Sequence, residues 1–342
     1  MASPAEIAAM RRALTLAETP GVPLGPNPRV GCVLLDPGGA SIAVGYHRGA
    51  GHPHAEVDAL MAAGERARGA TAVVTLEPCN HTGRTGPCAD ALLAAGIARV
   101  VYAQQDGNPM ARGGGETLRA AGVDVEGGVL ADEARAVNPM WTFAVENGRP
   151  FVTWKYAATL DGRSAAADGS SRWITSPEAR GDVHRLRAEC DAILVSTETV
   201  LADNPQLTVR DAAGEPLGRG HRPLRVVMGR RGVPAEAAVL DGAADTLVLN
   251  TRDPAAVLKR LLDEDCQHVL LEGGPTLAGA FLRAGLVDRV IAYLAPALLG
   301  AGPAALSDAG VGTIADAIRL EIIDIARVGS DVRLTAVRRE HT

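Results

Sequence analysis

The segment from His54 to Cys88 constrains the fold of this chain most strongly, because its motif requires three metal-binding side chains to meet in one site. It contains Pro53-His54-Ala55-Glu56 and, further along, Pro78-Cys79 and Pro87-Cys88. One imidazole and two thiolates give Zn²⁺ three protein ligands, the number typical of a catalytic site that keeps a position open for water. A bound zinc ion would lower the pKa of that water towards neutrality. The sequence therefore predicts a catalytic zinc site formed by His54, Cys79 and Cys88.

Glu56 lies two residues after the first ligand, so it can stand beside the metal without binding it. A glutamate there can take a proton from the water and pass it to a leaving amine. The order H-x-E followed by P-C and a second cysteine is the signature of zinc deaminases that act on nucleobases. Taken singly, each residue has an ordinary alternative, since a free cysteine is often just a small buried hydrophobe. The combination favours the metal site, with Glu56 as the catalytic residue.

The spacing of the two cysteines departs from that signature, because eight residues separate Cys79 from Cys88 where the signature has two. The segment Cys79-Asn80-His81-Thr82-Gly83-Arg84-Thr85-Gly86-Pro87-Cys88 closely resembles the deaminase half of the bifunctional riboflavin-biosynthesis deaminase–reductases. Asn27-Pro28-Arg29-Val30-Gly31 and Gly45-Tyr46-His47 also resemble segments of that family. The resemblance implies a cytidine-deaminase-like three-layer domain in which four residues place the substrate, namely Asn27, His47, His81 and Arg84.

Length and charge limit the other classes of function. A chain of 342 residues is long enough for two domains with separate cores. Its net charge of −6 argues against general nucleic-acid binding, yet it permits a small phosphorylated ligand held by a few arginines. Three cysteines remain beyond the two assigned to zinc, which fits a reducing compartment better than a disulfide framework. With no signal peptide and no apolar run long enough to cross a bilayer, we expect a cytoplasmic protein without membrane contact.

Strands and helices alternate along the whole chain, which is typical of α/β layered domains. The polar, turn-forming segment Asn147-Gly148-Arg149-Pro150 lacks apolar periodicity. We therefore predict a deaminase domain over residues 1–148 and a second domain over residues 149–342. The pattern also predicts one helix over residues 131–145 and a polar loop over residues 201–210.

The second domain lacks the complete G-x-G-x-x-G fingerprint, so a standard dinucleotide-binding fold is not supported. It does contain an apolar strand that runs into Glu272-Gly273-Gly274 and then a helix. Glycines allow a ligand to approach the backbone, and the N-terminus of the helix offers free N–H groups to a phosphate. A Gly-Gly pair is also a common way to turn the chain, so this motif alone leaves both interpretations open.

Three further segments of the second domain, 160–163, 173–176 and 201–210, resemble the reductase half of the same family. The resemblance implies a dihydrofolate-reductase-like α/β domain that uses NADPH. It assigns cofactor contacts to Trp173, Thr199, Asp203, Gly274, Pro275, Thr276, Leu277, Ala278 and Gly279. It assigns substrate contacts to Ser171, Arg187, Leu207, Arg210 and Glu272. Gly229-Arg230-Arg231 departs from the family, which more often has an acidic residue and a serine there; Arg230 or Arg231 is a candidate for the 2′-phosphate of NADPH.

Together these features predict a bifunctional enzyme of riboflavin biosynthesis with one zinc ion per chain and NADPH. It would deaminate 2,5-diamino-6-ribosylamino-4(3H)-pyrimidinone 5′-phosphate and then reduce the ribosyl group of 5-amino-6-(5-phosphoribosylamino)uracil to ribityl. Its expected partners are small phosphorylated pyrimidines and, by analogy, further copies of the chain. Two alternatives stay open: a nucleic-acid base deaminase with an appended domain, and a deaminase whose C-terminal half only binds or dimerises.

Overall fold

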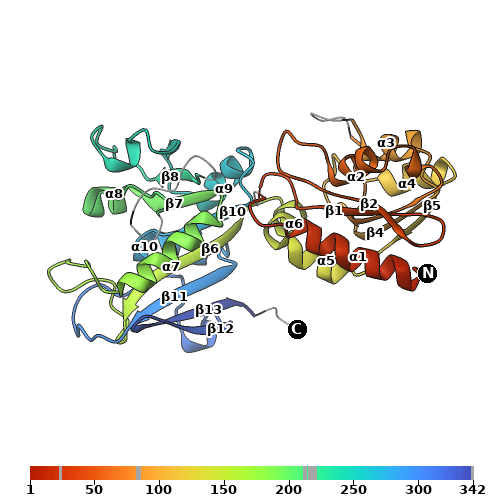
Figure 1. Cartoon of the computed structure of the whole chain (residues 1–342). Helices are drawn as coiled ribbons and strands as arrows, with labels where there is room; N and C mark the ends of the chain where they lie inside the picture. The colour runs from red at the N-terminus through yellow and green to blue at the C-terminus, as the bar shows by residue number, and fades with distance from the viewer. Residues whose placement is uncertain (23–24, 82–85, 211–213, 215–221, 340–342) are drawn as a thin grey trace. The chain divides into compact units, whose positions relative to one another are not determined.

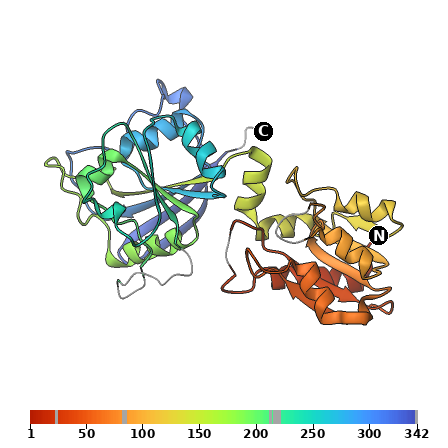
Figure 2. The same cartoon turned by 90° about the horizontal axis from the view of Figure 1, so that it is seen from above.

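The computed structural model describes the chain except for residues 23–24, 82–85, 211–213, 215–221 and 340–342. It divides into two compact units, Met1–Asn147 and Gly148–Thr342, and the division falls within the polar turn around residue 148. Figures 1 and 2 show a sheet flanked by helices in each unit. No helix among the described residues is long and apolar enough to cross a membrane.

Unit 1 is built on a five-stranded sheet with the order β2-β1-β3-β4-β5. Strand β1 pairs antiparallel with β2 and β3, whereas β3, β4 and β5 run parallel. The strands are β1 (Gly31–Leu35), β2 (Ser41–Tyr46), β3 (Thr71–Leu76), β4 (Arg99–Gln104) and β5 (Asp124–Gly127). The helices are α1 (Pro4–Ala17), α2 (Ala55–Ala63), α3 (Cys88–Ala94), α4 (Gly114–Ala120), α5 (Ala131–Val137) and α6 (Pro139–Asn147), with the 3₁₀ helix η1 (Gly64–Ala67).

Alternation of small apolar side chains along the strands builds a core on each face of this sheet. On β3, Val73 packs with residues of α1 and α5, while Ala72 and Val74 pack with residues of α2, α3 and α4. Helix α2 lies very close to β2, because a Cβ at Gly45 would stand 2.3 Å from the carbonyl oxygen of Ala55. The result is a three-layer unit in which α2 and α3 begin at the same end of the sheet.

The helix predicted over residues 131–145 is wrong as a single element. The structure has two helices, α5 and α6, separated at Asn138, whose backbone leaves the helical region. Pro139 explains the break, because proline lacks an N–H and disfavours helical geometry in the residue before it. Asn138 then anchors the junction: its side chain accepts a hydrogen bond from the backbone N–H of Arg29 and donates one to the carbonyl of Arg29.

Unit 2 contains an eight-stranded sheet with the order β12-β13-β11-β6-β10-β7-β8-β9. The strands from β11 to β9 in this order run parallel, and β13 and β12 continue the sheet antiparallel. The strands are β6 (Phe151–Thr159), β7 (Ala192–Ser196), β8 (Leu224–Met228), β9 (Thr246–Leu249), β10 (His268–Leu271), β11 (Arg289–Ala295), β12 (Leu320–Val328) and β13 (Asp331–Arg338). The helices are α7 (Pro177–Ala188), α8 (Thr197–Asp203), α9 (Pro254–Leu262) and α10 (Pro275–Arg283), with 3₁₀ turns η2 (Ala238–Leu240) and η3 (Ile314–Asp316).

Helices cover both faces of this sheet, α9 and α10 on one and α7 and α8 on the other. Because six strands run parallel, the segments that follow them gather at the end of the sheet where the strands' carboxyl termini lie, and ligands of open α/β sheets bind there. The polar loop predicted over residues 201–210 is wrong in its first part. Helix α8 continues to Asp203, and the Ser196 side chain caps it by accepting a hydrogen bond from the N–H of Thr199.

Candidate active sites

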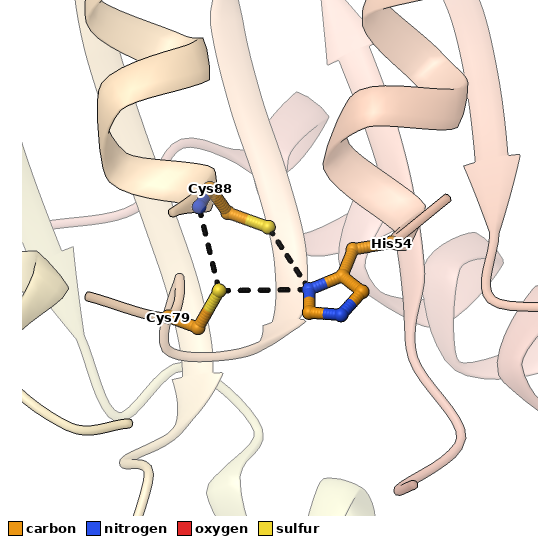
Figure 3. A group of neighbouring side chains, drawn as sticks. All are labelled: His54, Cys79 and Cys88. Atoms are coloured by element: carbon orange, nitrogen blue, oxygen red, sulfur yellow. Dashed lines mark hydrogen bonds between the residues drawn. The ribbon is translucent and has the colours of Figure 1, made fainter. Parts of the chain in front are cut away.

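In unit 1, the side chains of His54, Cys79 and Cys88 point toward one another (Figure 3). His54 lies immediately before α2 and Cys88 is the first residue of α3, while Cys79 follows the end of β3. The His54 Nδ1 atom is 3.2 Å from the Cys88 Sγ atom and 3.5 Å from the Cys79 Sγ atom. The fold therefore brings together the three predicted ligands, although Cys79 and Cys88 lie 25 and 34 residues after His54 in the sequence.

The donor set and its spacing fit a zinc ion. Tetrahedral zinc, with bonds of about 2.05 Å to nitrogen and 2.3 Å to sulfur, holds a nitrogen ligand and a sulfur ligand about 3.6 Å apart. The His54 Nδ1 atom lies at similar distances from the two cysteine sulfurs. The three ligand atoms lie within 4.8 Å of one another. A hydrogen bond from Cys88 and the proximity of His54 lower the pKa of the Cys79 thiol, despite its burial. That shift favours the thiolate, which is the form that binds a metal.

Glu56, the second residue of α2, is buried beside this cluster with only 4% of its surface exposed. Burial raises the pKa of Glu56 to about 7, and the neighbouring Cys79 adds to the effect. A carboxyl group with that pKa exchanges its proton readily near neutral pH, as a general acid–base requires. The Cys88 thiol donates a hydrogen bond to the Glu56 carboxylate, so Glu56 faces the cluster.

His47 and Asn27, both predicted substrate residues, contact each other at the edge of the cluster. The His47 ring lies edge-on to the His54 ring, with centroids 5.3 Å apart. His47 Nδ1 donates to the carbonyl of Pro53 at 3.0 Å, which leaves Nε2 to accept from the Asn27 amide N–H at 3.0 Å. Burial lowers the pKa of His47, in agreement with this neutral form. The Asn27 amide oxygen takes no part in this hydrogen bond with His47.

The loop between the two cysteines is described only in part, and the predicted residue Arg84 lies outside the described residues. His81 is partly buried, and its Nδ1 atom has no hydrogen-bond partner within the described parts of the chain. A buried imidazole nitrogen of this kind is suited to bind a polar group of a ligand.

Sequence reasoning missed Asp106, which follows the end of β4 next to β3. It is 4% exposed, and burial together with Glu77 and Cys79 raises its pKa to about 6. Glu77 fixes this region, because its carboxylate accepts hydrogen bonds from the N–H groups of Asp106 and Gly115. The available signal was the position of the Asp106-Gly107-Asn108 turn directly after an apolar parallel strand.

In unit 2, Arg187 and Glu272 form a buried bidentate ion pair. Arg187 Nε is 2.6 Å from Glu272 Oε1, and Arg187 Nη2 is 2.9 Å from Glu272 Oε2. Burial alone would raise the pKa of Glu272, but the charge and hydrogen bonds of Arg187 hold it at about 2. Lys155, which sequence reasoning missed, lies 3.9 Å from the same carboxylate. Its signal was that it is the single charged residue within the largely buried strand β6.

The segment that carries Leu207 and Arg210 is held against α7. Arg187 Nη1 donates to the carbonyl of Thr208 at 3.1 Å, and the backbone N–H of Arg210 donates to His184 Nδ1 at 3.2 Å. The backbone of Arg210 therefore lies beside α7, and its side chain contacts Gln206 and the carbonyl of Gly214, whereas the Leu207 side chain is buried in the core. Among the predicted substrate residues, Arg187 and Glu272 contact each other directly, Arg210 lies on the segment held against the same helix, and Ser171 lies on the separate 171–176 segment.

Trp173 and Asp203, two predicted cofactor residues, are held close together through Arg172. The guanidinium of Arg172, next to Trp173, donates to the carbonyl of Asp203 at the end of α8. Trp173 itself is 68% exposed, and the Arg180 guanidinium covers its ring 4.4 Å from the centroid. Thr199, in the same helix, shares a hydrogen bond with Ser196. The Arg172 guanidinium also lies over the Trp173 ring, 5.9 Å from its centroid, so two cations surround this exposed indole.

The predicted cofactor segment 274–279 divides into an accessible start and a buried remainder. A Cβ at Gly274, the residue before α10, would meet nothing within 4 Å, so ligands can reach the backbone there. Leu277 and Ala278 belong to the core, and a Cβ at Gly279 would stand 2.3 Å from the carbonyl oxygen of Asp308. Gly279 therefore serves close packing of α10, and only the first turn is open to a phosphate.

Residues 4–104 match the family model described as the cytidine and deoxycytidylate deaminase zinc-binding region, and residues 150–334 match the RibD C-terminal domain. Riboflavin biosynthesis protein RibD from Mycobacterium tuberculosis is 51% identical over 316 residues, which cover 92% of each chain. The Escherichia coli protein of the same name is 43% identical, with 96% of this chain and 98% of its own covered.

Solved structures agree with these sequence matches. The structure of Acinetobacter baumannii RibD superposes with a TM-score of 0.87 at 38% identity, covering 98% of this chain and 99% of that one. A Thermotoga maritima structure, described as a diaminohydroxyphosphoribosylaminopyrimidine deaminase and 5-amino-6-(5-phosphoribosylamino)uracil reductase, gives 0.82 at 33% identity with the same coverage. The predicted fold class, a cytidine-deaminase-like unit followed by a dihydrofolate-reductase-like one, is confirmed.

The reductase family match across unit 2 contradicts the alternative of a C-terminal half that only binds or dimerises. The matched domains also imply a zinc site in the first unit and a nicotinamide cofactor in the second. Because both halves match in order and the relatives are covered almost end to end, the chain belongs to the RibD family and is a bifunctional deaminase and reductase of riboflavin biosynthesis.

Proposed function

We propose that unit 1 removes the 2-amino group of 2,5-diamino-6-ribosylamino-4(3H)-pyrimidinone 5′-phosphate by hydrolysis. We further propose that unit 2 reduces the ribosyl group of the resulting 5-amino-6-(5-phosphoribosylamino)uracil to ribityl. The convergence of His54, Cys79 and Cys88 beside the buried Glu56 carries the first assignment. The substrates are those named for the Thermotoga maritima relative.

In unit 1, His54, Cys79 and Cys88 would hold the zinc ion, which when bound acts as a Lewis acid and lowers the pKa of water. Glu56 would accept a proton from the attacking water and pass it to the departing amine, since burial brings its pKa to about 7. The Asn27 amide, oriented by His47, and the unpartnered Nδ1 atom of His81 orient the pyrimidine. We assign Arg84 to the substrate phosphate on the family resemblance alone.

In unit 2, Arg210 binds the 5′-phosphate, because a guanidinium can form paired hydrogen bonds with phosphate oxygens. Glu272, ionised through its contact with Arg187, accepts hydrogen bonds from ribose hydroxyls. Lys155 lies beside that carboxylate and offers N–H donors to the ribose oxygen. Ser171 and the backbone of Leu207 complete the substrate contacts.

We place NADPH at the carboxyl end of the parallel strands of unit 2, where it would supply the hydride for the reduction. The accessible backbone at Gly274 and the backbone N–H of Thr276, in the first turn of α10, suit its pyrophosphate, while Pro275 begins the helix without an N–H of its own. Trp173, Thr199 and Asp203 lie nearby at the same end of the sheet. Arg230 suits the 2′-phosphate better than Arg231, because Arg231 already pairs with Glu198 at 2.9 Å.

We also propose that the protein is a homo-oligomer in the cytoplasm, with small phosphorylated pyrimidines as its ligands and no nucleic-acid or membrane partner. Strand β12 at the edge of the sheet supports association, because Ile322 and Ile325 are 55% and 65% exposed. They pair with Ala336 and Leu334 on β13, two residues apart, so both isoleucines lie on one face. An apolar patch on an unpaired sheet edge is typical of an association surface.

Separate assays of the two half-reactions test this proposal. Glu56→Gln preserves the size of the side chain but cannot accept the proton, so deamination should fall about 10²–10⁴-fold. Reduction of 5-amino-6-(5-phosphoribosylamino)uracil by NADPH should stay at the wild-type rate. Arg210→Ala is the reciprocal variant, expected to weaken reduction while ammonia release continues.

Two results would contradict the proposed function. Deamination by Glu56→Gln within a factor of a few of wild type would remove Glu56 from the proton transfer. Loss of NADPH oxidation in the same variant, with circular dichroism unchanged, would contradict two separate sites.

A further inference from the structure

Arg225, in the middle of unit 2, is a charged side chain that is almost fully buried, with 1% of its surface exposed. Its guanidinium pairs with Asp241 Oδ1 at 2.7 Å and donates to the carbonyls of Asp241 and Ala244. It also donates to the carbonyl of Gln206 at 3.3 Å. A buried charge is costly unless its partners are well placed, so the buried guanidinium fixes both the 241–244 turn and the backbone at Gln206.

Gln206 connects this buried pair to the proposed phosphate ligand. Its Nε2 atom donates to Asp241 Oδ2 at 2.5 Å, and its Oε1 atom accepts from Arg210 Nη2. A carboxylate only accepts hydrogen bonds and a guanidinium only donates them, so the amide has a single favourable orientation. Arg225, Asp241, Gln206 and Arg210 therefore form one continuous hydrogen-bonded chain from the core to the site.

This arrangement leaves Arg210 available to a ligand. A guanidinium carries five N–H donors, and Arg210 uses one on Gln206 and one on the carbonyl of Gly214, at 2.7 Å. The remaining donors have fixed directions, because two contacts already determine the plane of the group. Such an arginine is suited to bind a phosphate with little loss of side-chain freedom.

The backbone beside Gln206 is held just as firmly. Leu207 has φ +54°, in the left-handed region that a branched, buried side chain rarely adopts. The carbonyl before it is held by Arg225 and the carbonyl after it, of Thr208, by Arg187. Strained backbone held from both sides is typical of ligand sites.

We propose that Gln206 is a positioning residue for the reductase substrate: anchored to buried Arg225 through Asp241, it holds the Arg210 guanidinium in the orientation that binds the 5′-phosphate. This inference rests on the proposed function, which assigns Arg210 to that phosphate. It adds a residue that touches no substrate atom and acts only through Arg210.

The test compares the substrate with the same compound lacking its phosphate, using the full chain and NADPH. Gln206→Met keeps the length of the side chain and removes its hydrogen bonds to Asp241 and Arg210, together with the one it accepts from the Thr208 hydroxyl. The KM for 5-amino-6-(5-phosphoribosylamino)uracil should rise about tenfold with kcat unchanged, the change expected for losing one hydrogen bond to a charged group. The KM for 5-amino-6-ribosylaminouracil should stay unchanged. Gln105→Met, at an exposed position in unit 1, is the matched control.

A double-mutant cycle asks whether Gln206 acts through Arg210. In an Arg210→Met background, Gln206→Met should raise the KM no further. Gln206→Glu provides a second variant: its carboxylate still accepts from Arg210 but cannot donate to Asp241, so Arg210 loses its anchor and the KM should again rise for the phosphorylated substrate alone.

The positioning role would be overturned by equal losses on both substrates, by effects of Gln206→Met and Arg210→Met that simply add, or by an unchanged KM in Gln206→Met. These outcomes leave the proposed function intact as long as Arg210→Met itself raises the KM for the phosphorylated substrate. An Arg210→Met variant with the wild-type KM would instead show that the phosphate binds elsewhere.

Discussion

His268, at the start of β10, is a buried neutral histidine that should make the stability of unit 2 depend on pH. It is 7% exposed, its Nδ1–H donates to the carbonyl of Glu189 at 3.1 Å, and Nε2 accepts from the Thr153 hydroxyl at 2.8 Å. Burial lowers its pKa to about 4, and nearby Arg289 acts in the same direction. Protonation would also remove the acceptor that Thr153 uses.

The sign follows from comparison with the unfolded chain, where a histidine has a pKa of about 6.5. Between pH 6.5 and pH 4 the unfolded state binds a proton that the folded state does not, so stability falls as the pH falls through this window. Two values that differ by about 2.5 units correspond to a limit of roughly 3 kcal/mol. Between pH 7.5 and pH 5 the loss should be about 2 kcal/mol.

Urea unfolding followed by fluorescence measures this loss in unit 2. The chain has three tryptophans, and Trp154 lies next to Thr153 on β6, stacked on Tyr156. Replacing Trp141 and Trp173 by Phe leaves Trp154 as the single probe. In this background, His268→Gln should lower the free energy of unfolding at pH 7.5 through its altered contacts. On going from pH 7.5 to pH 5, however, the variant should lose about 2 kcal/mol less of that free energy than the protein that keeps His268.

The comparison of slopes separates the histidine from other groups that titrate in the same range, because those groups are present in both proteins. If the two proteins lost the same stability between pH 7.5 and pH 5, His268 would not be neutral in the fold as described. The reasoning about its burial would then be refuted.

Three further predictions concern the sites and the proposed association surface. Cys79→Ser removes one thiolate, so bound zinc measured by atomic absorption should fall to a small fraction of wild type; stoichiometric zinc would show that Cys79 is not a ligand. Arg230→Gln should raise the KM for NADPH about tenfold and leave that for NADH unchanged, because only NADPH has a 2′-phosphate. Arg231→Gln is its control, and an equal change for both cofactors would contradict the assignment. Ile325→Asp should reduce the mass in light scattering to that of one chain; an unchanged assembly would exclude this patch of β12.

The zinc motif was readable from the sequence because its geometry is local to a few well-marked joints. His54 precedes a helix, Cys79 follows an apolar strand, and Cys88 begins a helix. Parallel strands and the helices that follow them place such joints at one end of a sheet whatever the rest of the chain does. The fold class and the two enzymatic activities were implied by the resemblance of these and other segments to the riboflavin-biosynthesis family, and both are confirmed.

The ends of helices were less reliably predicted where a single residue acted against a strong hydrophobic or polar pattern. The apolar spacing over residues 131–145 concealed the effect of Pro139, although the proline is visible in the sequence. The polar composition after Val200 concealed the end of α8, because a cap at Ser196 and burial of Val200 stabilise the helix.

The sequence by itself determined the two-part α/β organisation, the three candidate zinc ligands and the motifs of the reductase half, because periodicity and short motifs are encoded by near neighbours. Only the tertiary structure revealed that Arg187 pairs with Glu272, that Lys155 lies beside that carboxylate and Asp106 beside Glu77, and that Gly279 serves packing. It alone linked Arg225 to Arg210 through Asp241 and Gln206. These contacts join residues on different strands and loops, and their energies depend on burial and distance, which single-sequence patterns do not specify.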